Sequence, residues 1–266
     1  GRETGQHLVT HPDVAMVSFT GSTAAGRKIG AACGELLRRV TLELGGKSAA
    51  IICDDADLDA IMPELIAAST MNNGQACVAQ TRILAIRNRY DEVVEALTEA
   101  VAAIPVGDPA DMETGCGPLI AERQRDRVEG YLQIGRDEGA RITTGGGRPD
   151  GQDRGWFVEP TVFADVDNSM RIAQEEIFGP VLAVIPVDDT DDAIRVANDS
   201  DYGLSGTVWT GDVEAGLDIA RKVRTGTYTV NGFAMEWGAP FGGFKDSGVG
   251  RELGPEGLAA YLESKT

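Results

Sequence analysis

A cysteine that follows a polar, glycine-containing stretch is the first residue of chemical interest in this chain. It is Cys77, which ends the segment NNGQAC at residues 72–77. A turn of this composition can present a thiol at a bend, where the thiolate acts as a nucleophile and its backbone N–H supports the oxyanion of an attacked carbonyl. Most free cysteines are buried and inert, so this segment alone favours a structural thiol over a catalytic one.

A carboxylate between two leucines is the second candidate. Glu43 lies between Leu42 and Leu44 and is followed by Gly45 and Gly46. Apolar neighbours would desolvate the carboxylate, which raises its pKa and makes it a better base near neutral pH. The paired glycines would let the backbone turn sharply or approach a ligand closely. A surface glutamate ahead of a turn is the alternative, and the local sequence leaves it open.

A third segment, FTGSTAAG at residues 19–26, lies where a predicted strand meets a predicted helix. Free N–H groups at a helix N-terminus bind phosphate, and Gly21 would let the backbone come close. Ser22 or Thr23 would either cap the helix or donate to a pyrophosphate. The segment is not GxGxxG, and it is not a P-loop, because Arg27 stands where that motif requires lysine. Phosphate binding and ordinary helix capping both remain open.

The elements that would position these segments alternate between short apolar runs and amphipathic stretches, which indicates an α/β architecture. Strands are predicted over 14–20, 40–44, 48–52, 181–187, 206–210 and 227–230, and helices over 24–38, 90–104, 119–139, 191–198 and 213–223. The glycine-rich stretch 145–155 is predicted to be a surface loop. No linker interrupts the pattern, so one compact unit is expected.

The composition narrows the classes of protein and partner. With 266 residues, of which 42% are hydrophobic and 25% charged, the chain is typical of a soluble globular protein. A net charge of -18 disfavours nucleic acid and anionic membranes as partners, since both need basic patches. Four cysteines without a CxxC pair favour a reducing cytoplasm over a disulfide framework. His7 and His11 form an HxxxH pair, which alone is weak evidence for a metal site, so none is predicted.

Taken together, five motifs resemble the aldehyde dehydrogenase superfamily in order and approximate spacing. They are FTGSTAAG (19–26), LELGGKS (42–48), NNGQACVA (72–79), EEIFGPV (175–181) and PFGGFKDSGVGRE (240–252). The resemblance covers almost the whole chain and corresponds to the C-terminal half of a member. It implies an α/β fold of the aldehyde dehydrogenase type, with residues 1–46 as the closing part of a Rossmann-type NAD(P)-binding domain. Residues 47–266 would form the catalytic domain and end at the start of the strand that pairs across subunits.

The resemblance also implies catalytic roles. Cys77 matches the family's nucleophile and Glu43 its general base. Met71 and Phe241 match side chains that line the substrate site. Glu252 matches an acidic residue linked to proton relay, and a purely structural carboxylate is the equal alternative. The residues that match cofactor contacts are Thr20, Gly21, Ser22 and Gly26 near the pyrophosphate, Leu44 and Phe178 beside the nicotinamide, and Glu176 on its ribose.

The chemistry implied by the resemblance is oxidation of a small aldehyde to a carboxylic acid with NAD or NADP, with NAD favoured. Cys77 would attack the aldehyde to give a thiohemiacetal, hydride transfer would leave a thioester, and water activated by Glu43 would release the acid. Met235 and Trp237 lie where the family sets specificity, and they suit an apolar substrate. A homo-oligomer, dimer or tetramer, is expected of the complete protein, with no metal, nucleic acid or membrane partner.

Two departures from the family leave alternatives. The family's oxyanion asparagine and its NAD/NADP-discriminating lysine belong to the half that this chain does not match, so the isolated chain is expected to bind cofactor poorly and turn over little or nothing. A relative that acylates coenzyme A or reduces an activated acyl group is the first alternative, although Glu43 favours water as the acceptor. A non-catalytic half-protein that acts in assembly is the second.

Overall fold

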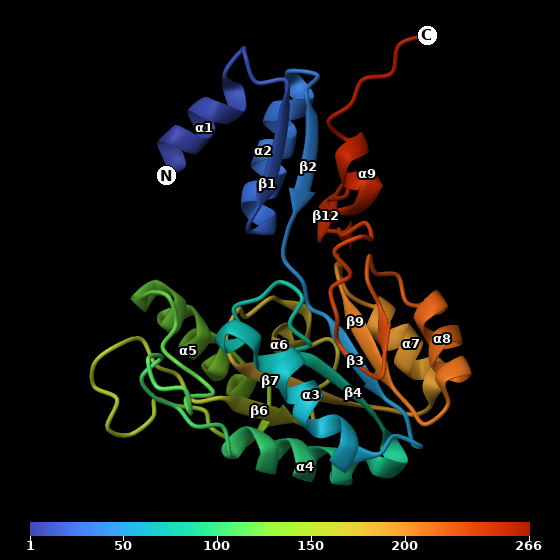
Figure 1. The fold of residues 1–266 in the computed structure, drawn as a ribbon. Helices are drawn as coiled ribbons and strands as arrows, with labels where there is room; N and C mark the ends of the chain where they lie inside the picture. Colours follow the sequence, from blue (N-terminus) through green and yellow to red (C-terminus); the bar gives the residue numbers. More distant parts are fainter.

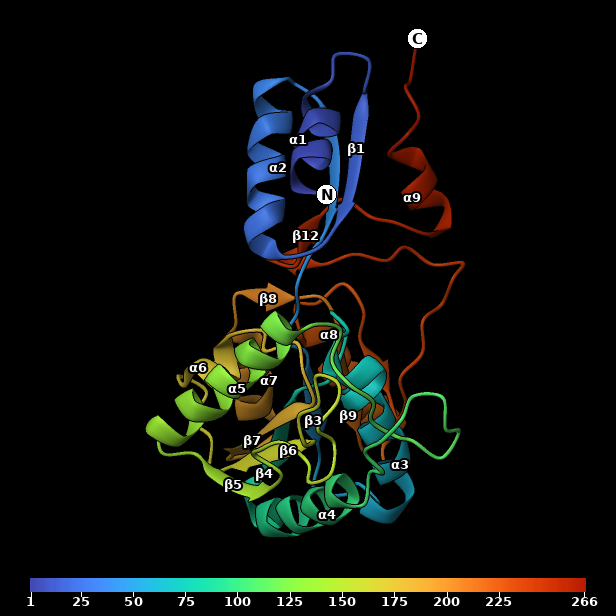
Figure 2. The same ribbon diagram turned by 90° about the vertical axis from the view of Figure 1, so that its left-hand side faces the viewer.

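The computed structural model describes residues 1–266 and has two parts, a larger α/β unit and a smaller one above it (Figures 1 and 2). The chain begins in the smaller unit and crosses once into the larger unit. It returns to the smaller unit near its C-terminal end. The two crossings lie side by side, and the candidate chemical residues are found near them.

The smaller unit is a short sheet with helices beside it. Its elements are α1 (Arg2–Thr10), β1 (Met16–Thr20), α2 (Thr23–Glu35), β2 (Arg39–Glu43), β12 (Gly248–Val249) and α9 (Gly254–Ala259). Strands β1 and β2 are parallel and are connected by α2, and β12 pairs antiparallel with β2. Helix α2 begins after Ser22, whose hydroxyl accepts a hydrogen bond from the backbone N–H of Ala25 and so satisfies one free donor of the first turn.

The larger unit is built on a seven-stranded sheet in the order β10-β9-β3-β4-β7-β6-β5, parallel except for β5. Its strands are β3 (Ala49–Ile52), β4 (Arg82–Ile86), β5 (Arg141–Thr144), β6 (Thr161–Ala164), β7 (Val181–Val187), β9 (Gly206–Trp209) and β10 (Thr229–Val230). Its helices are α3 (Leu58–Thr70), α4 (Tyr90–Ala102), α5 (Glu122–Asp137), α6 (Arg171–Gln174), α7 (Thr190–Asn198) and α8 (Val213–Lys222). The shorter elements are the 3-10 turns η1 (Met71–Gly74) and η2 (Arg87–Arg89) and the antiparallel pair β8 (Tyr202–Gly203) and β11 (Phe244–Lys245).

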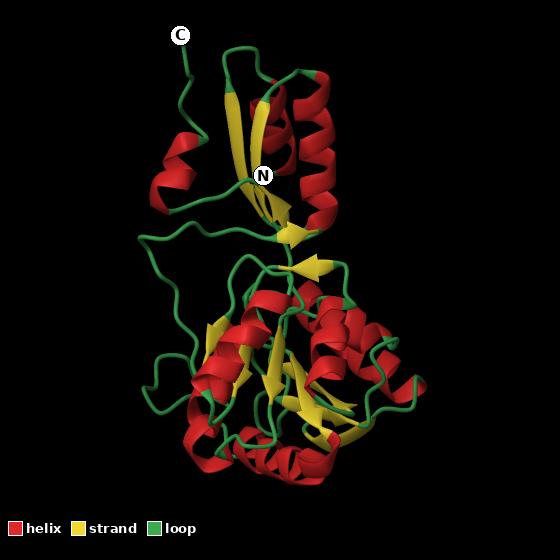
Figure 3. Cartoon of the chain, turned by 90° about the vertical axis from the view of Figure 1, so that its right-hand side faces the viewer, coloured by secondary structure: helices red, strands yellow, loops and turns green.

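Helices cover both faces of this sheet, so its strands have an apolar core on each side (Figure 3). On β3, Ala49 and Ile51 face the core formed with α5 to α8, whereas Ala50 and Ile52 face the core formed with α3 and α4. Burial on both faces explains why β3 and β7 are continuous apolar runs rather than alternating ones. None of the helices combines the length and apolar character needed to cross a bilayer.

The α/β class and every strand and helix predicted from the sequence are confirmed, with ends displaced by a few residues. The elements that were not predicted are α1, α3, α6, α9, β4, β5 and β6, and the short η1, η2, β8, β11 and β12. Helix α1 buries no residue and so lacks an apolar stripe. Helix α3 contains Pro63, and β4 begins with the buried Arg82, whose guanidinium donates to the carbonyls of Lys47, Val196 and Ala197. A charged residue or a proline interrupts the apolar pattern by which a buried helix or strand is predicted.

The prediction of one compact unit is wrong, because Figure 1 shows two parts joined by narrow crossings. The first crossing runs through residues 41–50, all of which are buried. Because it is buried, it is not the exposed, flexible kind of linker that marks a domain boundary. The division into domains 1–46 and 47–266 stays a prediction, but β12 belongs to the second segment and completes the sheet of the first.

We expect Gly248→Ala to destabilise the return crossing. Gly248 has φ +147, and a Cβ there would overlap the backbone carbonyl oxygen of Leu42 in β2. The expected loss exceeds about 1 kcal/mol in the free energy of unfolding by urea. Gly34→Ala is the matched control, because a Cβ at Gly34 meets nothing within 4 Å and the residue is helical, so this change should be neutral or stabilising. Equal unfolding curves for the two variants would contradict the expectation.

Candidate active site

The turn that carries Cys77 is built from left-handed backbone. Asn72, Asn73 and Gly74 have φ values of 50°, 57° and 71°. Asparagine tolerates this region better than other residues with a side chain, and glycine adopts it freely. A Cβ on Gly74 would overlap the carbonyl oxygen of Gly179, so the glycine is required by close approach as well as by φ. The polar composition of the segment is thus explained by a tight turn that ends one α-helix and presents Cys77.

The Cys77 thiol is half-buried, whereas Cys33, Cys53 and Cys116 are fully buried. Burial raises the pKa of the Cys77 thiol and the nearby Glu176 raises it further, while the backbone N–H of Cys77 itself lowers it. Of the four cysteines, Cys77 is therefore the one a reagent reaches most readily, and its own N–H lies close to the sulfur. The interpretation of this cysteine as a buried structural thiol is not supported.

Glu43 ends β2 as a buried carboxyl group that is 3% exposed, and both of its oxygens lack a hydrogen-bond partner. Desolvation by burial raises its pKa to about 8, with a further rise from Glu252 and an opposing effect of Arg251. Gly242 leaves room for the carboxyl, since a Cβ there would lie 2.7 Å from Glu43 Oε1. The surface-glutamate alternative is wrong, and the group can hold or release a proton near neutral pH.

The crossing segment links Glu43 to Cys77 through backbone contacts. A Cβ on Gly46 would overlap the carbonyl oxygen of Cys77, so the two backbones touch at this point. Ser247 on the returning tail accepts the N–H of Leu44 at its carbonyl (2.9 Å) and donates its hydroxyl to the carbonyl of Gly45 (2.7 Å). The fully buried Ser247 thereby fixes the crossing from the other side. Sequence reasoning missed this role, because Ser247 bonds to backbone groups about 200 residues away in the sequence, and such contacts leave no local pattern.

Glu176 lies on the other side of the same segment. Its Oε1 accepts the N–H of Gly46 at 3.0 Å, and a Cβ on Gly45 would lie 2.6 Å from its Oε2. Burial raises the pKa of Glu176, and the Gly46 N–H and the Arg127 charge oppose the rise. Phe178, two residues on, has φ +65, a strained conformation for a side chain of this size. The close approach of the Glu176 carboxylate explains the glycine at position 45, as the close approach of the Cys77 carbonyl explains the glycine at position 46.

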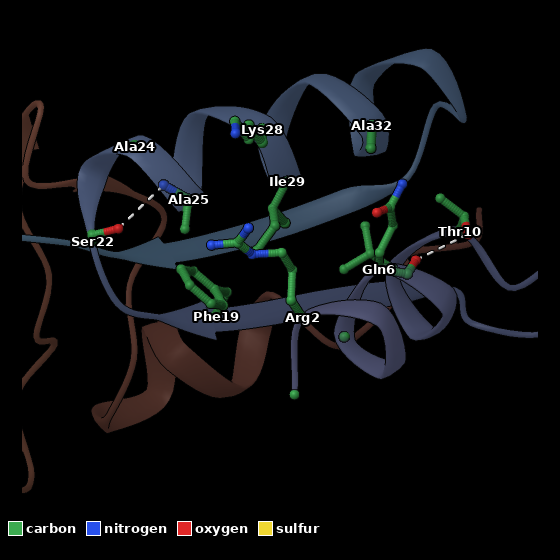
Figure 4. Close-up of a pocket in the computed structure, with 13 residues that line it drawn as sticks. Arg2, Gln6, Thr10, Phe19, Ser22, Ala24, Ala25, Lys28, Ile29 and Ala32 are labelled. Carbon is green, nitrogen blue, oxygen red and sulfur yellow. Dashed lines mark hydrogen bonds between the residues drawn. The ribbon is translucent and has the colours of Figure 1, made fainter.

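A groove of about 590 Å³ lies between α1 and α2 (Figure 4). Phe19, Ala25 and Ile29 supply apolar lining, and Ser22 stands at its end, where the N-terminus of α2 opens. Helix α1 supplies the opposite wall, which the sequence analysis missed because α1 was not predicted. The residues of that wall are Gly1, Arg2, Gly5, Gln6, Val9 and Thr10.

The remaining residues of the α2 motif connect this groove to Glu43. Thr20 is paired with Glu43 in the β1–β2 register, and the N–H of Gly21 donates to the Glu43 carbonyl at 3.0 Å. A Cβ on Gly26 would overlap the side chain of Leu44, so this glycine lets Leu44 pack beneath α2. The structure therefore places Thr20, Gly21, Gly26 and Leu44 between the start of α2 and the end of β2, next to Glu43, although none of them lines the groove.

Met71 lies in the turn before Cys77, and Phe241 lies on the returning tail between β10 and β11. Met71 begins η1 and is half-buried. Phe241 and Glu252 exchange backbone hydrogen bonds of 2.7 Å in both directions. One oxygen of Glu252 accepts the hydroxyl of Ser18 at 2.7 Å. Glu252 is thus held at the edge of the smaller unit, close enough to raise the pKa of Glu43.

Lys47 is a buried charge that sequence reasoning did not single out. Its Nζ has no hydrogen-bond partner, and burial lowers its pKa to about 7, with Arg82 lowering it and Glu176 raising it. Only the presence of a lysine two residues before the apolar run of β3 could have drawn attention to it. His7 and His11 meet edge to face with ring centroids 5.4 Å apart, and no group of three or more potential metal ligands is present.

Comparison with known proteins gives one consistent family. The protein-family model of the "Aldehyde dehydrogenase family" matches residues 1–266 of this chain. A geranial dehydrogenase of Castellaniella defragrans is 57% identical over 265 residues, covering 100% of this chain and 55% of the relative. A 3-succinoylsemialdehyde-pyridine dehydrogenase of Pseudomonas is 46% identical over 266 residues, covering 100% and 56%. The chain spans about half the length of the curated relatives it matches.

Solved structures agree with the fold. An aldehyde dehydrogenase of Mycobacterium tuberculosis complexed with NAD+ has a TM-score of 0.95 and 60% identity, covering 96% of this chain and 53% of that chain. A C291A mutant of aldehyde dehydrogenase C from Pseudomonas syringae, complexed with NAD+ and octanal, has a TM-score of 0.95 and 43% identity, covering 98% and 54%. The expected α/β fold of the aldehyde dehydrogenase type is confirmed, over about half of each of those chains.

The burial of Glu43 predicts a specific pH dependence of stability. Its pKa rises from 4.5 to about 8 on folding, so between these values the folded protein holds a proton that the unfolded chain releases. Glu43 therefore lowers the free energy of unfolding as the pH rises through this window, by at most about 5 kcal/mol. Glu43→Gln should gain stability relative to the wild type between about pH 5 and about pH 9 in urea titrations.

The surface change Glu99→Gln is the control for this titration, because Glu99 is exposed on α4. In this variant the free energy of unfolding should change between about pH 5 and about pH 9 by the same amount as in the wild type. A Glu43→Gln variant whose stability followed the wild type at both pH values would show that the carboxyl is not desolvated.

Proposed function

This chain belongs to the aldehyde dehydrogenase family, and we propose that the protein containing it oxidises an aldehyde to a carboxylic acid with NAD(P)+ as the hydride acceptor. The observation that carries the proposal is the crossing at residues 43–46. It holds a buried carboxyl group, touches the backbone of a half-buried cysteine and donates to Glu176. A nucleophile, a base and a polar anchor are thereby gathered around one glycine pair.

Cys77 is the proposed nucleophile. Its sulfur, deprotonated, forms a bond to the aldehyde carbon, and the carbonyl oxygen becomes an oxyanion that the Cys77 backbone N–H can stabilise. The tetrahedral carbon then loses its hydrogen with the electron pair, which leaves a thioester on the sulfur. The nicotinamide cofactor, when bound, supplies the acceptor for that hydride.

Glu43 is the proposed base for release of the acid. With no hydrogen-bond partner on either oxygen, it can take a proton from a water molecule that attacks the thioester carbon. The thiolate of Cys77 is the leaving group, and the carboxylic acid departs. Since the pKa of Glu43 is about 8, the share of the basic form grows as the pH rises through that value. Water is favoured over coenzyme A as acceptor, because acyl transfer to a thiol needs no base at this position.

The residues around the groove between α1 and α2 fit an adenine dinucleotide. The apolar walls suit a planar base and the open N-terminus of α2 suits a pyrophosphate, with Gly21 allowing close approach and Ser22 capping the helix. Leu44, Glu176 and Phe178 are proposed for the nicotinamide end. NAD is favoured over NADP because the related structures described above are NAD+ complexes.

The proposed substrate is an apolar aldehyde. One relative is named a geranial dehydrogenase, and one related structure holds octanal. In this chain, Met235 and Trp237 lie exposed on the loop after β10, and Trp237 is 71% exposed. Met71 and Phe241 are proposed to line the substrate path, and Glu252 to relay protons from Glu43. We propose a cytoplasmic homo-oligomer as the complete form, and the non-catalytic half-protein is the alternative that the assay below tests.

We expect Glu43→Gln in the complete natural protein to separate the two halves of the reaction. With octanal and NAD+, the variant should release a burst of NADH equal to the number of active sites and then stop, because the thioester forms but water is not activated. Intact-protein mass spectrometry should find the acyl group, and peptide mapping should place it on Cys77.

The controls for this burst are two cysteine variants. Cys77→Ala should give neither burst nor adduct, whereas Cys53→Ala, at a buried cysteine, should turn over like the wild type. No NADH from the wild-type protein with any aldehyde would favour the non-catalytic alternative, and a steady rate from Glu43→Gln would remove Glu43 from the proposed role.

A further inference from the structure

Residues 117–127, outside all the motifs, touch both the turn that carries Cys77 and the stretch that carries Glu176. This segment runs from the loop before α5 into the first turns of that helix. We call it the bracket. At both ends its contacts are hydrogen bonds between a side chain and a backbone group. The two partners are far apart in the sequence, so the fold alone brings them together.

At the nucleophile end, two amide side chains of the turn reach the bracket. Asn73 donates from Nδ2 to the carbonyl of Pro118 (3.1 Å), and its Oδ1 accepts the N–H of Gly117 (3.0 Å). Gln75 accepts the N–H of Ile120 at its Oε1 (3.1 Å). Each amide uses a geometry that neither a carboxylate nor an aliphatic side chain could reproduce. The left-handed turn is therefore tied to the bracket on either side of Gly74.

At the other end, the bracket holds the backbone of residues 176–178. Gln124 donates from Nε2 to the carbonyl of Phe178 (2.7 Å) and also lies 3.3 Å from that of Ile177. Arg127 donates from Nε to the carbonyl of Ile177 (3.1 Å) and from its terminal nitrogen to that of Glu176. Phe178 has a strained positive φ, and such a conformation persists only where its surroundings hold it.

The turn that carries Cys77 also contacts the backbone just after Phe178 directly. Gly74 of the turn packs against the carbonyl of Gly179, and Gly179 in turn leaves room for the fully buried Val128 of α5. The bracket itself is fastened to the core, since the N–H of Leu119 donates to the carbonyl of Trp156 (3.0 Å). A displacement at either end is thus transmitted to the other through packed atoms.

We propose that the bracket fixes the position of the Cys77 thiol relative to the Glu176–Phe178 segment, with Asn73, Gln75, Gln124 and Arg127 as its positioning residues. The inference rests on the proposed function for the tasks of the two ends, thiol attack at one and cofactor binding at the other. It adds that neither task is set locally: each end is aligned through residues that touch no reacting atom.

The test uses Gln124→Met, which keeps the length of the side chain and removes its donors. In the complete natural protein, KM for NAD+ should rise about threefold to tenfold, the effect of losing one hydrogen bond. Alkylation of Cys77 by iodoacetamide should accelerate by a similar factor, because desolvation is the largest cause of its raised pKa and a looser turn admits water. Cys33, Cys53 and Cys116 should stay protected, which excludes general unfolding.

Two further variants complete the design. Gln133→Met makes the same change on an exposed face of α5 and should alter neither quantity. Gln75→Met breaks the opposite end and should also raise KM for NAD+. If each of Gln124→Met and Gln75→Met affected only its own end, the bracket would be overturned. The alkylation readout needs no turnover, so it tests the bracket even where the wild type fails to oxidise an aldehyde.

Discussion

The structure depends on the burial of one polar crossing. Residues 41–50 leave the smaller unit, pass between the two parts and enter the central sheet without exposing a side chain to solvent. Within this stretch Glu43 and Lys47 have no partners for their charged ends, a costly arrangement that proteins avoid unless the groups are neutral or used. The raised pKa of Glu43, the lowered pKa of Lys47 and the glycine pair between them are consequences of the same constraint.

That constraint also explains why the returning tail matters. The crossing stays buried because β12 pairs with β2 and Ser247 bonds to the backbone of Leu44 and Gly45. The motif near the C-terminal end of the chain therefore supports the motif near its beginning, although some 200 residues separate them. The two parts of the molecule are joined by the segment that contains the proposed base Glu43, and the burial of this segment leaves no room for a flexible linker.

Periodicity was sufficient to predict the elements with an apolar stripe or run, such as α4 and β7, and the α/β class followed from their alternation. It failed for β4, because that strand starts with a buried arginine. It failed for α1 for another reason: the helix buries no residue and so has no apolar stripe. Motifs located Cys77 and Glu43, but they could not reveal that Ser247, Asn73 or Gln124 bond across long sequence separations. Such contacts involve one side chain and one backbone group, and they leave no local pattern. The two-part shape was missed for the same reason.

Burial is expected to keep Glu43 protonated at neutral pH beside the Cys77 turn. Infrared difference spectroscopy over a pH titration observes this carboxyl directly, with the Glu43→Gln spectrum as reference for assigning its C=O band. We expect a carboxylic acid band that disappears with a midpoint at about pH 8. A midpoint near 4.5, the ordinary value for glutamate, would show instead that the crossing is open to water and that Glu43 is ionised at neutral pH.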